Sequence, residues 1–496
     1  MSAPILEARR AATAPREVLA RLRRALPASA LLTAPEELKP YECDGLTLYR
    51  QPPLAVALPG DEDQVLAVLR ICRATGTPVI ARGAGTGLSG GATPRADAVL
   101  LVLSRLDRIL HLDPQARSAR VQPGVRNLAI SEAAAPYGLT YAPDPSSQIA
   151  CSIGGNIAEN SGGVHCLKYG LTLHNLLRLR VATIEGEILE LGSEALDAPG
   201  YDLVALLTGS EGLLGVVTEA TLRLIPAAPC ARVVLAAFDD LKRAGAAVAA
   251  VIAAGFIPAG LELMDRPAIA AVEPYAQAGY PLDAEAILLC ELDGTAEALD
   301  EELARVEAVL RAAGARDCRV SRSDAERARL WAGRKAAFPA VGRLAPDYYC
   351  MDGTIPKKAL AAVLGEIRAM EKKYGLACAN VFHAGDGNLH PLILFDANRP
   401  EQVARAEAFG QEILQRCVAH GGSITGEHGV GIEKLDAMCA QFGADELELF
   451  HALKRAFDPY GLLNPGKAIP SLHRCAEFGR LHVHAGRLPH PELPRF

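Results

Sequence analysis

The sequence predicts an α+β protein whose sheets lie in two separate domains. A strand begins at Pro52, a helix capped by Asp61 follows it, and 78–81 forms the next strand. After Pro226, strand candidates alternate with long amphipathic helices, the clearest over 295–313. That second pattern is typical of an antiparallel sheet with helices on one side, and it indicates a domain boundary near residue 227.

Four regions follow from these elements. Residues 1–47 form a helical lead-in, 48–227 a cofactor-binding domain, 228–400 a second domain, and 401–496 a helical cap that ends in a tail.

The composition of the chain excludes several classes of function. The chain has 496 residues, 22% of them charged, and its net charge of −7 with no basic cluster excludes a nucleic-acid-binding footprint. The N-terminal arginines precede no apolar core of signal-peptide length, and the longest apolar run, 244–256, is too short to span a bilayer. Twelve cysteines occur without a C-x-x-C pair, which argues against a disulfide framework, an iron–sulfur cluster and a zinc knuckle. A cytoplasmic location fits best.

The stretch 82–91, Arg-Gly-Ala-Gly-Thr-Gly-Leu-Ser-Gly-Gly, is the most informative part of the chain. It contains a literal G-x-G-x-x-G, but a nicotinamide-binding fingerprint requires those glycines to open a helix. Here a strand at 98–103 follows. We therefore predict a pyrophosphate cradle for a flavin dinucleotide, in which loop N–H groups hold the anion without a helix N-terminus. A purely structural glycine-rich turn is the alternative.

Two further segments rich in glycine, 143–163 and 209–218, are separated from the first by sheet elements and can converge with it on one extended ligand. A long surface loop is the alternative for 143–163. The predicted cofactor-binding residues are Arg82, Gly83, Ala84, Gly85, Thr86, Gly87, Leu88, Ser89, Gly90, Pro143, Ser147, Gly154, Gly155, Asn160, Gly163, Gly215, Val217 and Asn464.

Two motifs in the second half carry ionisable groups. His383 and His390, with Glu427, form a two-histidine, one-carboxylate set for a divalent metal such as Zn, Fe or Mn. Ordinary histidines at strand ends are the alternative. His428 is then free to act as a base toward an alcohol. Arg334 is a candidate to hold a substrate carboxylate bidentately, against the alternative of a solvated helix arginine.

Several of these motifs, in this order, resemble a known family. The glycine loop, the 143–145 Pro-Asp-Pro, the 154–163 stretch and 215–218 look like the FAD-binding domain of vanillyl-alcohol-oxidase-type flavoproteins. The two histidine motifs and 464–467 resemble the D-2-hydroxyacid dehydrogenases of that superfamily. The segments 331–335 and 347–356, with the tail from His473, are similar to the FAD-linked subunits of bacterial glycolate oxidases.

The resemblance implies a two-subdomain, PCMH-type FAD-binding domain, a ferredoxin-like substrate domain and a helical C-terminal region. It implies that Arg334 is the carboxylate clamp, that His383, His390 and Glu427 are metal ligands, and that His428 is the base. Thr86 stands near the place where some relatives carry a flavin-linking histidine, so non-covalent FAD is expected. Leu392 replaces a polar residue of 2-hydroxyglutarate-type relatives, which suggests a small pocket.

The resulting hypothesis is FAD-dependent oxidation of a small 2-hydroxy acid to the 2-oxo acid, with glycolate favoured. A D-lactate or other D-2-hydroxyacid dehydrogenase that acts without a complex is the alternative. The resemblance also implies a second flavin-type subunit, an iron–sulfur subunit and peripheral association with the inner membrane through them. A sugar or aromatic-alcohol oxidase and a non-catalytic flavin-binding subunit are the rival interpretations.

Overall fold

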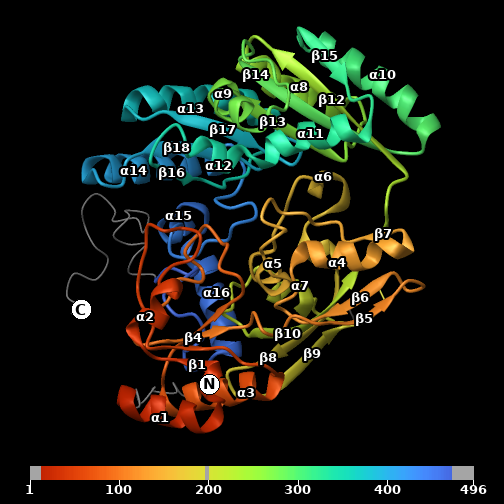
Figure 1. Ribbon diagram of the computed structural model, residues 1–496. Coiled ribbons are helices and arrows are strands. Elements are labelled where there is room, and N and C mark those ends of the chain that lie inside the picture. Colours follow the sequence, from red (N-terminus) through yellow and green to blue (C-terminus); the bar gives the residue numbers. More distant parts are fainter. Residues whose placement is uncertain (1–12, 196–199, 472–496) are drawn as a thin grey trace.

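The computed structural model describes residues 13–195 and 200–471. The tail motif from His473 lies outside these residues. Two domains are stacked, with the N-terminal half of the chain below and most of the following half above (Figure 1). The C-terminal helices return to the lower domain.

The first half of the lower domain is a four-stranded sheet of order β1-β2-β4-β3. Its strands are β1 (Leu31–Leu32), β2 (Ala55–Ala57), β3 (Val79–Arg82) and β4 (Val99–Val102), and its helices are α1 (Pro15–Ala25), α2 (Pro35–Leu38) and α3 (Glu62–Thr75). Asp61 caps α3 as predicted, because its carboxylate accepts from the Gln64 N–H at 2.8 Å. β3 and β4 are parallel, and no helix occurs between them over the described residues 83–98, which confirms the predicted strand, glycine loop and strand.

The second half of this domain is a five-stranded antiparallel sheet of order β5-β6-β10-β8-β9. It comprises β5 (Ile109–Asp113), β6 (Ser118–Val121), β8 (Leu176–Ala182), β9 (Ile188–Gly192) and β10 (Val216–Arg223); β7 (Leu139–Thr140) pairs separately with β11 (Ile225–Pro226). Its helices are α4 (Asn127–Ala134), α5 (Ile153–Glu159), α6 (Cys166–Tyr169) and α7 (Leu203–Leu207). The alternative of one long surface loop over 143–163 was therefore wrong, since α5 occupies part of it.

The upper domain is built on a seven-stranded antiparallel sheet of order β15-β12-β14-β13-β17-β18-β16. The strands are β12 (Cys230–Phe238), β13 (Gly260–Asp265), β14 (Ala286–Gly294), β15 (Asp317–Val320), β16 (Asp347–Cys350), β17 (Cys378–Phe382) and β18 (Pro391–Phe395). The first four, numbered along the chain, lie in the order 4-1-3-2, which is the expected ferredoxin-like strand order. They are connected as β-α-β-α-β-α-β, because an additional helix (Arg266–Ala276) lies between the second and third strands.

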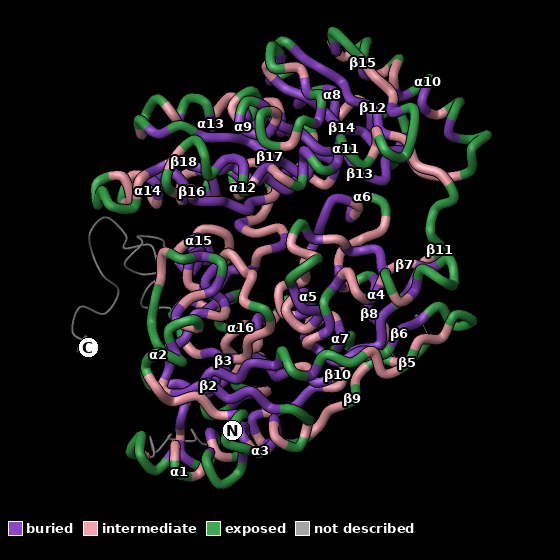
Figure 2. The backbone as a smooth tube through the Cα atoms, viewed as in Figure 1, coloured by how far each residue is buried: buried purple, intermediate pink, exposed green. Residues whose placement is uncertain are grey.

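Helices cover both faces of this sheet, so the expectation of helices on one side was wrong. The first face carries α8 (Leu241–Ala253), α10 (Ala296–Ala312), α13 (Leu360–Tyr374) and α14 (Pro400–Ala419); the second carries α9 (Arg266–Ala276), α11 (Asp324–Lys335) and α12 (Ala337–Val341). The reason lies in β12, where Val234, Ala236 and Phe238 face one apolar cluster and the residues between them face another. Figure 2 shows the sheet buried between helices with exposed outer surfaces.

The chain ends do not form separate units. α14 packs on α13 and β18, whereas α15 (Leu435–Gln441) and α16 (Ala444–Phe457) lead back to the lower domain. There the Val79 N–H donates to the Leu462 carbonyl at 2.8 Å, and the Asn464 N–H donates to the Val79 carbonyl at 2.9 Å. At the other end, β1 of the lead-in joins the first sheet through β2. In the described residues, none of the helices has both the length and the apolar character needed to cross a membrane.

Candidate active site

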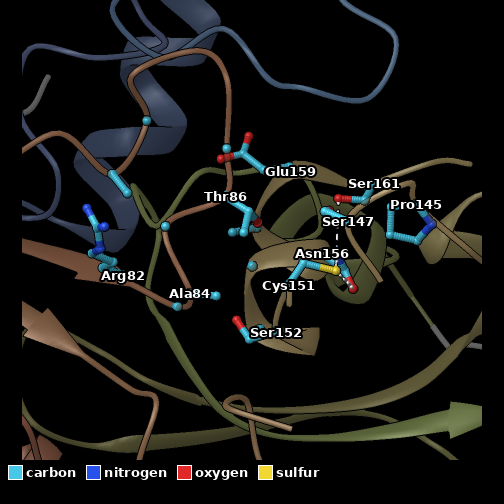
Figure 3. Close-up of a pocket in the computed structure, with 18 of the residues that line it drawn as sticks. Arg82, Ala84, Thr86, Pro145, Ser147, Cys151, Ser152, Asn156, Glu159 and Ser161 are labelled. Atoms are coloured by element: carbon cyan, nitrogen blue, oxygen red, sulfur yellow. Dashed lines mark hydrogen bonds between the residues drawn. The ribbon is translucent and has the colours of Figure 1, made fainter. Parts of the chain in front are cut away.

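A cavity of about 360 Å³ lies between the glycine loop, α5 and the turn that carries Glu427 and His428. This volume is in the range of small-molecule and cofactor sites. Figure 3 shows the end formed by the lower domain, where Ala84 and Thr86 lie across from Ser147 and Ser152, whereas the Arg82 side chain points away from them. The cavity is therefore shared by the two domains.

The glycine loop is in direct contact with the start of α5. A Cβ added to Gly83 would lie 2.1 Å from Ser152 Oγ, and Gly85 has a φ of +73° that L side chains rarely adopt. The first residues of α5, including Gly154 and Gly155, line the cavity. The second glycine segment therefore brings the start of a helix to the cavity beside the loop, which the sequence pattern did not indicate.

The predicted cofactor residues fall into two groups. Those that line the cavity are Arg82, Gly83, Ala84, Gly85, Thr86, Gly87, Leu88, Ser147, Gly154, Gly155, Gly215 and Val217. Those outside its lining are Ser89, Gly90, Pro143, Asn160, Gly163 and Asn464. The second group supports the first: the Asn127 side chain donates to the Pro143 carbonyl, and Leu173 donates its N–H to Asn160.

Ser89 and Glu211 connect the glycine loop region to the turn at 426–431, and Asn464 bridges Gly91 and Glu211. Ser89 Oγ donates to the His428 carbonyl at 2.9 Å, and Asn464 donates to the carbonyls of Gly91 and Glu211. The Glu211 carboxylate accepts the N–H groups of Val430 and Gly431 at 2.7 and 2.8 Å. The glycine loop and the turn at 426–431 are thus held as one unit.

Glu159 is a buried acid in the cavity lining that the sequence did not single out. Its Oε2 is buried and has no hydrogen-bond partner among the described residues. Burial, reinforced by the neighbouring Glu211, raises the pKa of Glu159 well above its usual range, which favours the neutral form of the carboxyl group. A polar atom left unpaired in this position fits a cavity built for a polar ligand.

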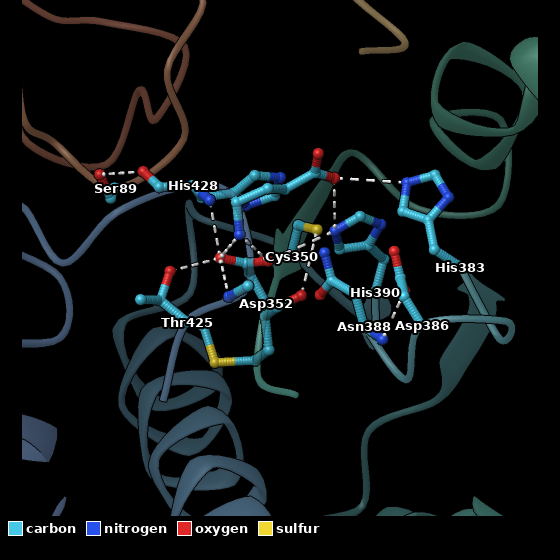
Figure 4. Close-up of polar contacts among 12 residues, drawn as sticks. Ser89, Cys350, Asp352, His383, Asp386, Asn388, His390, Thr425 and His428 are labelled. Atoms are coloured by element: carbon cyan, nitrogen blue, oxygen red, sulfur yellow. Dashed lines mark hydrogen bonds and ion pairs between the residues drawn. The ribbon is translucent and has the colours of Figure 1, made fainter. Parts of the chain in front are cut away.

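The predicted metal ligands meet at the other end of the cavity (Figure 4). Glu427 Oε1 lies 3.3 Å from His383 Nε2 and 3.2 Å from His390 Nε2, and the three side chains are buried. Neither ring nitrogen of His390 has a hydrogen bond of acceptable geometry within the described part of the chain, although a carboxylate is adjacent. Glu262 Oε1 lies 2.9 Å from His383 Nδ1. A histidine that binds a metal through one ring nitrogen commonly donates a hydrogen bond from the other ring nitrogen to a carboxylate in this way. This donor set fits a divalent cation.

His428 lies beside this set, with its ring stacked on that of His390 at 4.9 Å between centroids. Burial lowers the pKa of His428 to about 4, and its Nδ1 is buried without a hydrogen-bond partner among the described residues. The imidazole is therefore neutral at pH 7, with a ring nitrogen free to accept a proton.

Asp352 is the functional residue that sequence reasoning missed. Its Oδ2 accepts the N–H of Gly426 at 3.1 Å, the N–H of His428 at 2.8 Å and the Lys434 ammonium at 3.1 Å. Burial opposes its ionisation, but Lys434 and His428 hold its pKa well below its usual range. The signal was present as an aspartate in the 347–356 segment, but only the tertiary structure shows that it binds the catalytic turn.

Replacing Asp352 by Asn is expected to reduce kcat by about 10- to 100-fold, as loss of a supporting partner of a metal site does. The reason is that an amide of the same size removes the charge opposite Lys434 and one acceptor from the turn. FAD content should stay that of the native chain, since Asp352 does not line the cavity. An Asp352→Asn enzyme with native kcat, measured beside the exposed Asp324→Asn control, would contradict this role.

The structure adds detail to two expectations from the sequence. Arg334 is buried outside the cavity lining, and its Nε donates to Glu262 at 2.8 Å. Its Nη2 lies 2.7 Å from the same carboxylate but has no hydrogen bond of acceptable geometry among the described residues. Leu392 was expected to limit the pocket, but it is fully buried in the second apolar cluster. Phe338 is the apolar side chain at this end of the cavity lining, with its ring 6.2 Å from that of His390.

His165 joins the two domains behind the site. Its Nδ1 lies 2.8 Å from Asp144, in the predicted Pro-Asp-Pro motif, and its Nε2 lies 3.1 Å from Glu291 on β14. Glu291 also accepts from Arg327 and from the Trp331 indole on α11. Burial alone would lower the pKa of His165, yet Asp144 and Glu291 raise it to about 10. The imidazole is therefore a cation held by two carboxylates.

This raised pKa predicts a pH-dependent stability. A histidine whose pKa is about 10 folded and near 6.5 unfolded stabilises the fold fully below pH 6.5, and this contribution is lost as the pH rises toward 10. The difference in Tm between the native chain and His165→Gln should be several degrees near pH 6 and should shrink by pH 10, with His111→Gln as control. A difference that stays constant from pH 6 to pH 10 would contradict the charged state.

Comparison with known proteins defines the family. Residues 53–192 match the FAD binding domain model, and residues 228–468 match the model of the C-terminal domain of FAD linked oxidases. The chain is 62% identical over 479 residues to glycolate oxidase subunit GlcD of Escherichia coli K12, covering 97% of this chain and 96% of that one. The chain belongs to the GlcD family of FAD-linked oxidases.

GlcD of Bacillus subtilis is 38% identical over 428 residues, covering 86% of this chain and 91% of its own. Among solved structures, 4-ethylphenol oxidase from Gulosibacter chungangensis superimposes with a TM-score of 0.78 over 92% of this chain and 98% of its own, at 17% identity. This last likeness shows the shared fold alone. As a member of the GlcD family, the chain is an FAD-dependent oxidoreductase with the predicted PCMH-type fold.

Proposed function

We propose that this enzyme oxidises glycolate, or another small 2-hydroxy acid such as D-lactate, to the 2-oxo acid. The observation that carries the proposal is the single cavity that runs from the glycine loop to Glu427, His428 and His390. It brings a cofactor cradle, a neutral base and a candidate metal set into reach of one small substrate. The 62% identity to a glycolate oxidase subunit supports glycolate as the substrate.

The residues of the first cavity group, together with α5, would hold FAD, and FAD supplies the hydride acceptor when it is bound. We propose that it is held non-covalently. Thr86 stands in the loop, and burial raises the pKa of the Cys151 thiol in the cavity lining, which disfavours the thiolate. Denaturation in acid is expected to release all of the flavin from the protein.

His428 lines the cavity and is proposed to take the hydroxyl proton of the substrate on a ring nitrogen. Asp352 keeps the backbone of His428 in place, and Ser89 joins it to the cofactor loop. His383, His390 and Glu427 would hold a divalent cation, Zn, Fe or Mn, which lowers the pKa of a coordinated hydroxyl.

The chain is proposed to work as one subunit of a complex, because its GlcD relatives are subunits of glycolate oxidase. The proposed partners are a second flavin-type subunit and an iron–sulfur subunit. The proposed location is cytoplasmic, at the inner face of the membrane through those partners.

The test is the absorbance spectrum of the purified protein before and after glycolate is added without oxygen. An oxidised flavin spectrum that bleaches with glycolate supports both cofactor and substrate class. A panel containing D-lactate and 2-hydroxyglutarate then ranks the substrates, and best turnover with the larger diacid would overturn the small-substrate proposal. A spectrum that glycolate and D-lactate leave unchanged, but that an aromatic alcohol bleaches, would favour a different oxidase.

A further inference from the structure

Glu159 is the last residue of α5 and lines the cavity (Figure 3). Its carboxyl group lies between the glycine loop and the turn at 426–431. A Cβ added to Gly91 would lie 3.0 Å from Glu159 Oε1, and a Cβ added to Gly429 would lie 2.0 Å from its Oε2. Gly429 directly follows His428 in the chain. The carboxyl group is therefore placed where the cofactor cradle meets the backbone of the turn that carries the proposed base.

Neither oxygen of Glu159 accepts a hydrogen bond from a described residue, and Oε2 is also shielded from solvent. Its neighbour Glu211 differs, because that carboxylate accepts the N–H groups of Val430 and Gly431. An ionised carboxylate without donors is costly to bury, whereas a carboxylic acid can leave its carbonyl oxygen unpaired at a smaller cost. These contacts fit a protonated Glu159 beside an ionised Glu211.

The charged groups around Glu159 favour the same state. Burial raises the pKa of Glu159, Glu211 and Asp44 raise it further, and Lys434 and Lys467 oppose them. Both ammonium groups are engaged elsewhere, Lys434 by another carboxylate and Lys467 by backbone carbonyls. Two neighbouring carboxyl groups do not both ionise readily, and the one that lacks donors keeps the proton.

A carboxylic acid has one proton to donate, and Glu159 lines a cavity in which a bound ligand can accept it. FAD is the ligand proposed for this cavity. Its ring has to lie within reach of His428, because the substrate reacts with both. Glu159 stands beside the residue that follows His428, so the part of FAD nearest to it is the ring, whose carbonyl oxygens and nitrogens are hydrogen-bond acceptors.

We infer that Glu159 is a neutral hydrogen-bond donor to a carbonyl oxygen or nitrogen of the flavin ring and thereby raises the reduction potential of the flavin. The inference rests on the proposed function, since it assigns the position of the ring in the cavity. A donor aimed at an atom that gains electron density stabilises the reduced ring more than the oxidised ring. An ionised carboxylate in the same place would have the opposite effect.

The first test is the midpoint potential of the flavin in the FAD-loaded protein, titrated with dithionite, for Glu159→Gln and Glu159→Leu. Glutamine keeps a neutral donor of the same size and should leave the potential native. Leucine removes the donor and should lower the potential by about 30 mV, which is a tenfold change for a two-electron couple. It should also raise the Kd of FAD by about tenfold, as loss of a hydrogen bond does. The exposed Glu301→Gln, outside the cavity, is the control and should match the native chain.

Two results of this titration would overturn the inference. A potential that rises in Glu159→Gln would show that the native group is an anion. A native potential together with a native FAD Kd in Glu159→Leu would show that Glu159 does not contact the flavin.

A second measurement does not depend on the folding of the leucine variant. The infrared difference spectrum between the reduced and oxidised native protein should contain the carbonyl band of a protonated carboxyl group, shifted on reduction, and Glu159→Gln should lack it. Absence of this band from the native chain would overturn the inference. Dithionite replaces glycolate in both tests, so a protein that dithionite reduces but glycolate does not would contradict the proposed substrate and leave these readouts intact.

Discussion

Replacing Glu427 by Gln is expected to lower kcat/KM for the hydroxy acid by at least about 100-fold and to remove the bound metal. Loss of an outer partner of a metal ligand costs 10- to 100-fold, and loss of a ligand itself should reach at least the upper value. The Glu427 carboxylate lies between His383 and His390, with Oε1 at 3.3 and 3.2 Å from their Nε2 atoms. Glutamine keeps the shape but provides no negative charge to a divalent cation.

Elemental analysis per chain and steady-state kinetics test this prediction. The exposed Glu448→Gln variant is the control, and dialysis of the native enzyme against a chelator should reproduce the activity loss of Glu427→Gln. FAD content should stay native in all three samples, since Glu427 belongs to neither the glycine loop nor α5. Native activity in a metal-free sample would show that the His383, His390 and Glu427 set is not a metal site.

Replacing Gly85 by Val is expected to weaken FAD binding by about tenfold or more, because a β-branched residue at a φ of +73° is strained by roughly 1–3 kcal/mol. Gly90, with a φ of +78°, should behave in the same way. The ratio of flavin to protein absorbance after purification measures the effect.

The structure ranks these glycines more finely than their spacing does. Gly87 has no left-handed φ, and a Cβ there would meet nothing closer than Asp44 at 3.9 Å, so Gly87→Ala should retain more FAD than Gly85→Ala. Gly294→Ala is the control, because it lies outside the cavity and a Cβ there has open space. Native flavin content in Gly85→Val would refute the role of this loop as the cofactor cradle.

Structural features that depend on residues close together in the sequence were predicted correctly. Asp61 was recognised as a helix cap, and the strand after the glycine loop distinguished a flavin cradle from a nicotinamide fingerprint. Both depend on residues that are close in the sequence. The pairing of helices with sheet faces was predicted less well, because apolar residues on both faces of β12 do not reveal how many helices are available to cover them.

The predicted site residues also fall into two groups, those identified by their chemical type and those whose orientation depends on distant segments. His383, His390, Glu427 and His428 were found because their residue types are suited to metal binding and proton transfer, and the structure brings them together. The orientation of the Arg334 side chain depends on Glu262, which is 72 residues away in the chain and accepts a hydrogen bond from the guanidinium. Leu392 was assigned to the pocket, but the packing of the second apolar cluster turns it away.

The sequence by itself determined the family, the flavin loop and the chemical types gathered for oxidation, because glycines, histidines and carboxylates carry their chemistry wherever the chain places them. The tertiary structure alone decided which basic side chain of α11 lines the cavity. Arg334 and Lys335 are neighbours with the same charge, but one is buried against Glu262 and the other lines the cavity. The physical reason is that a side chain's availability depends on the partners that distant segments bring to it, and adjacent positions on a helix point in different directions.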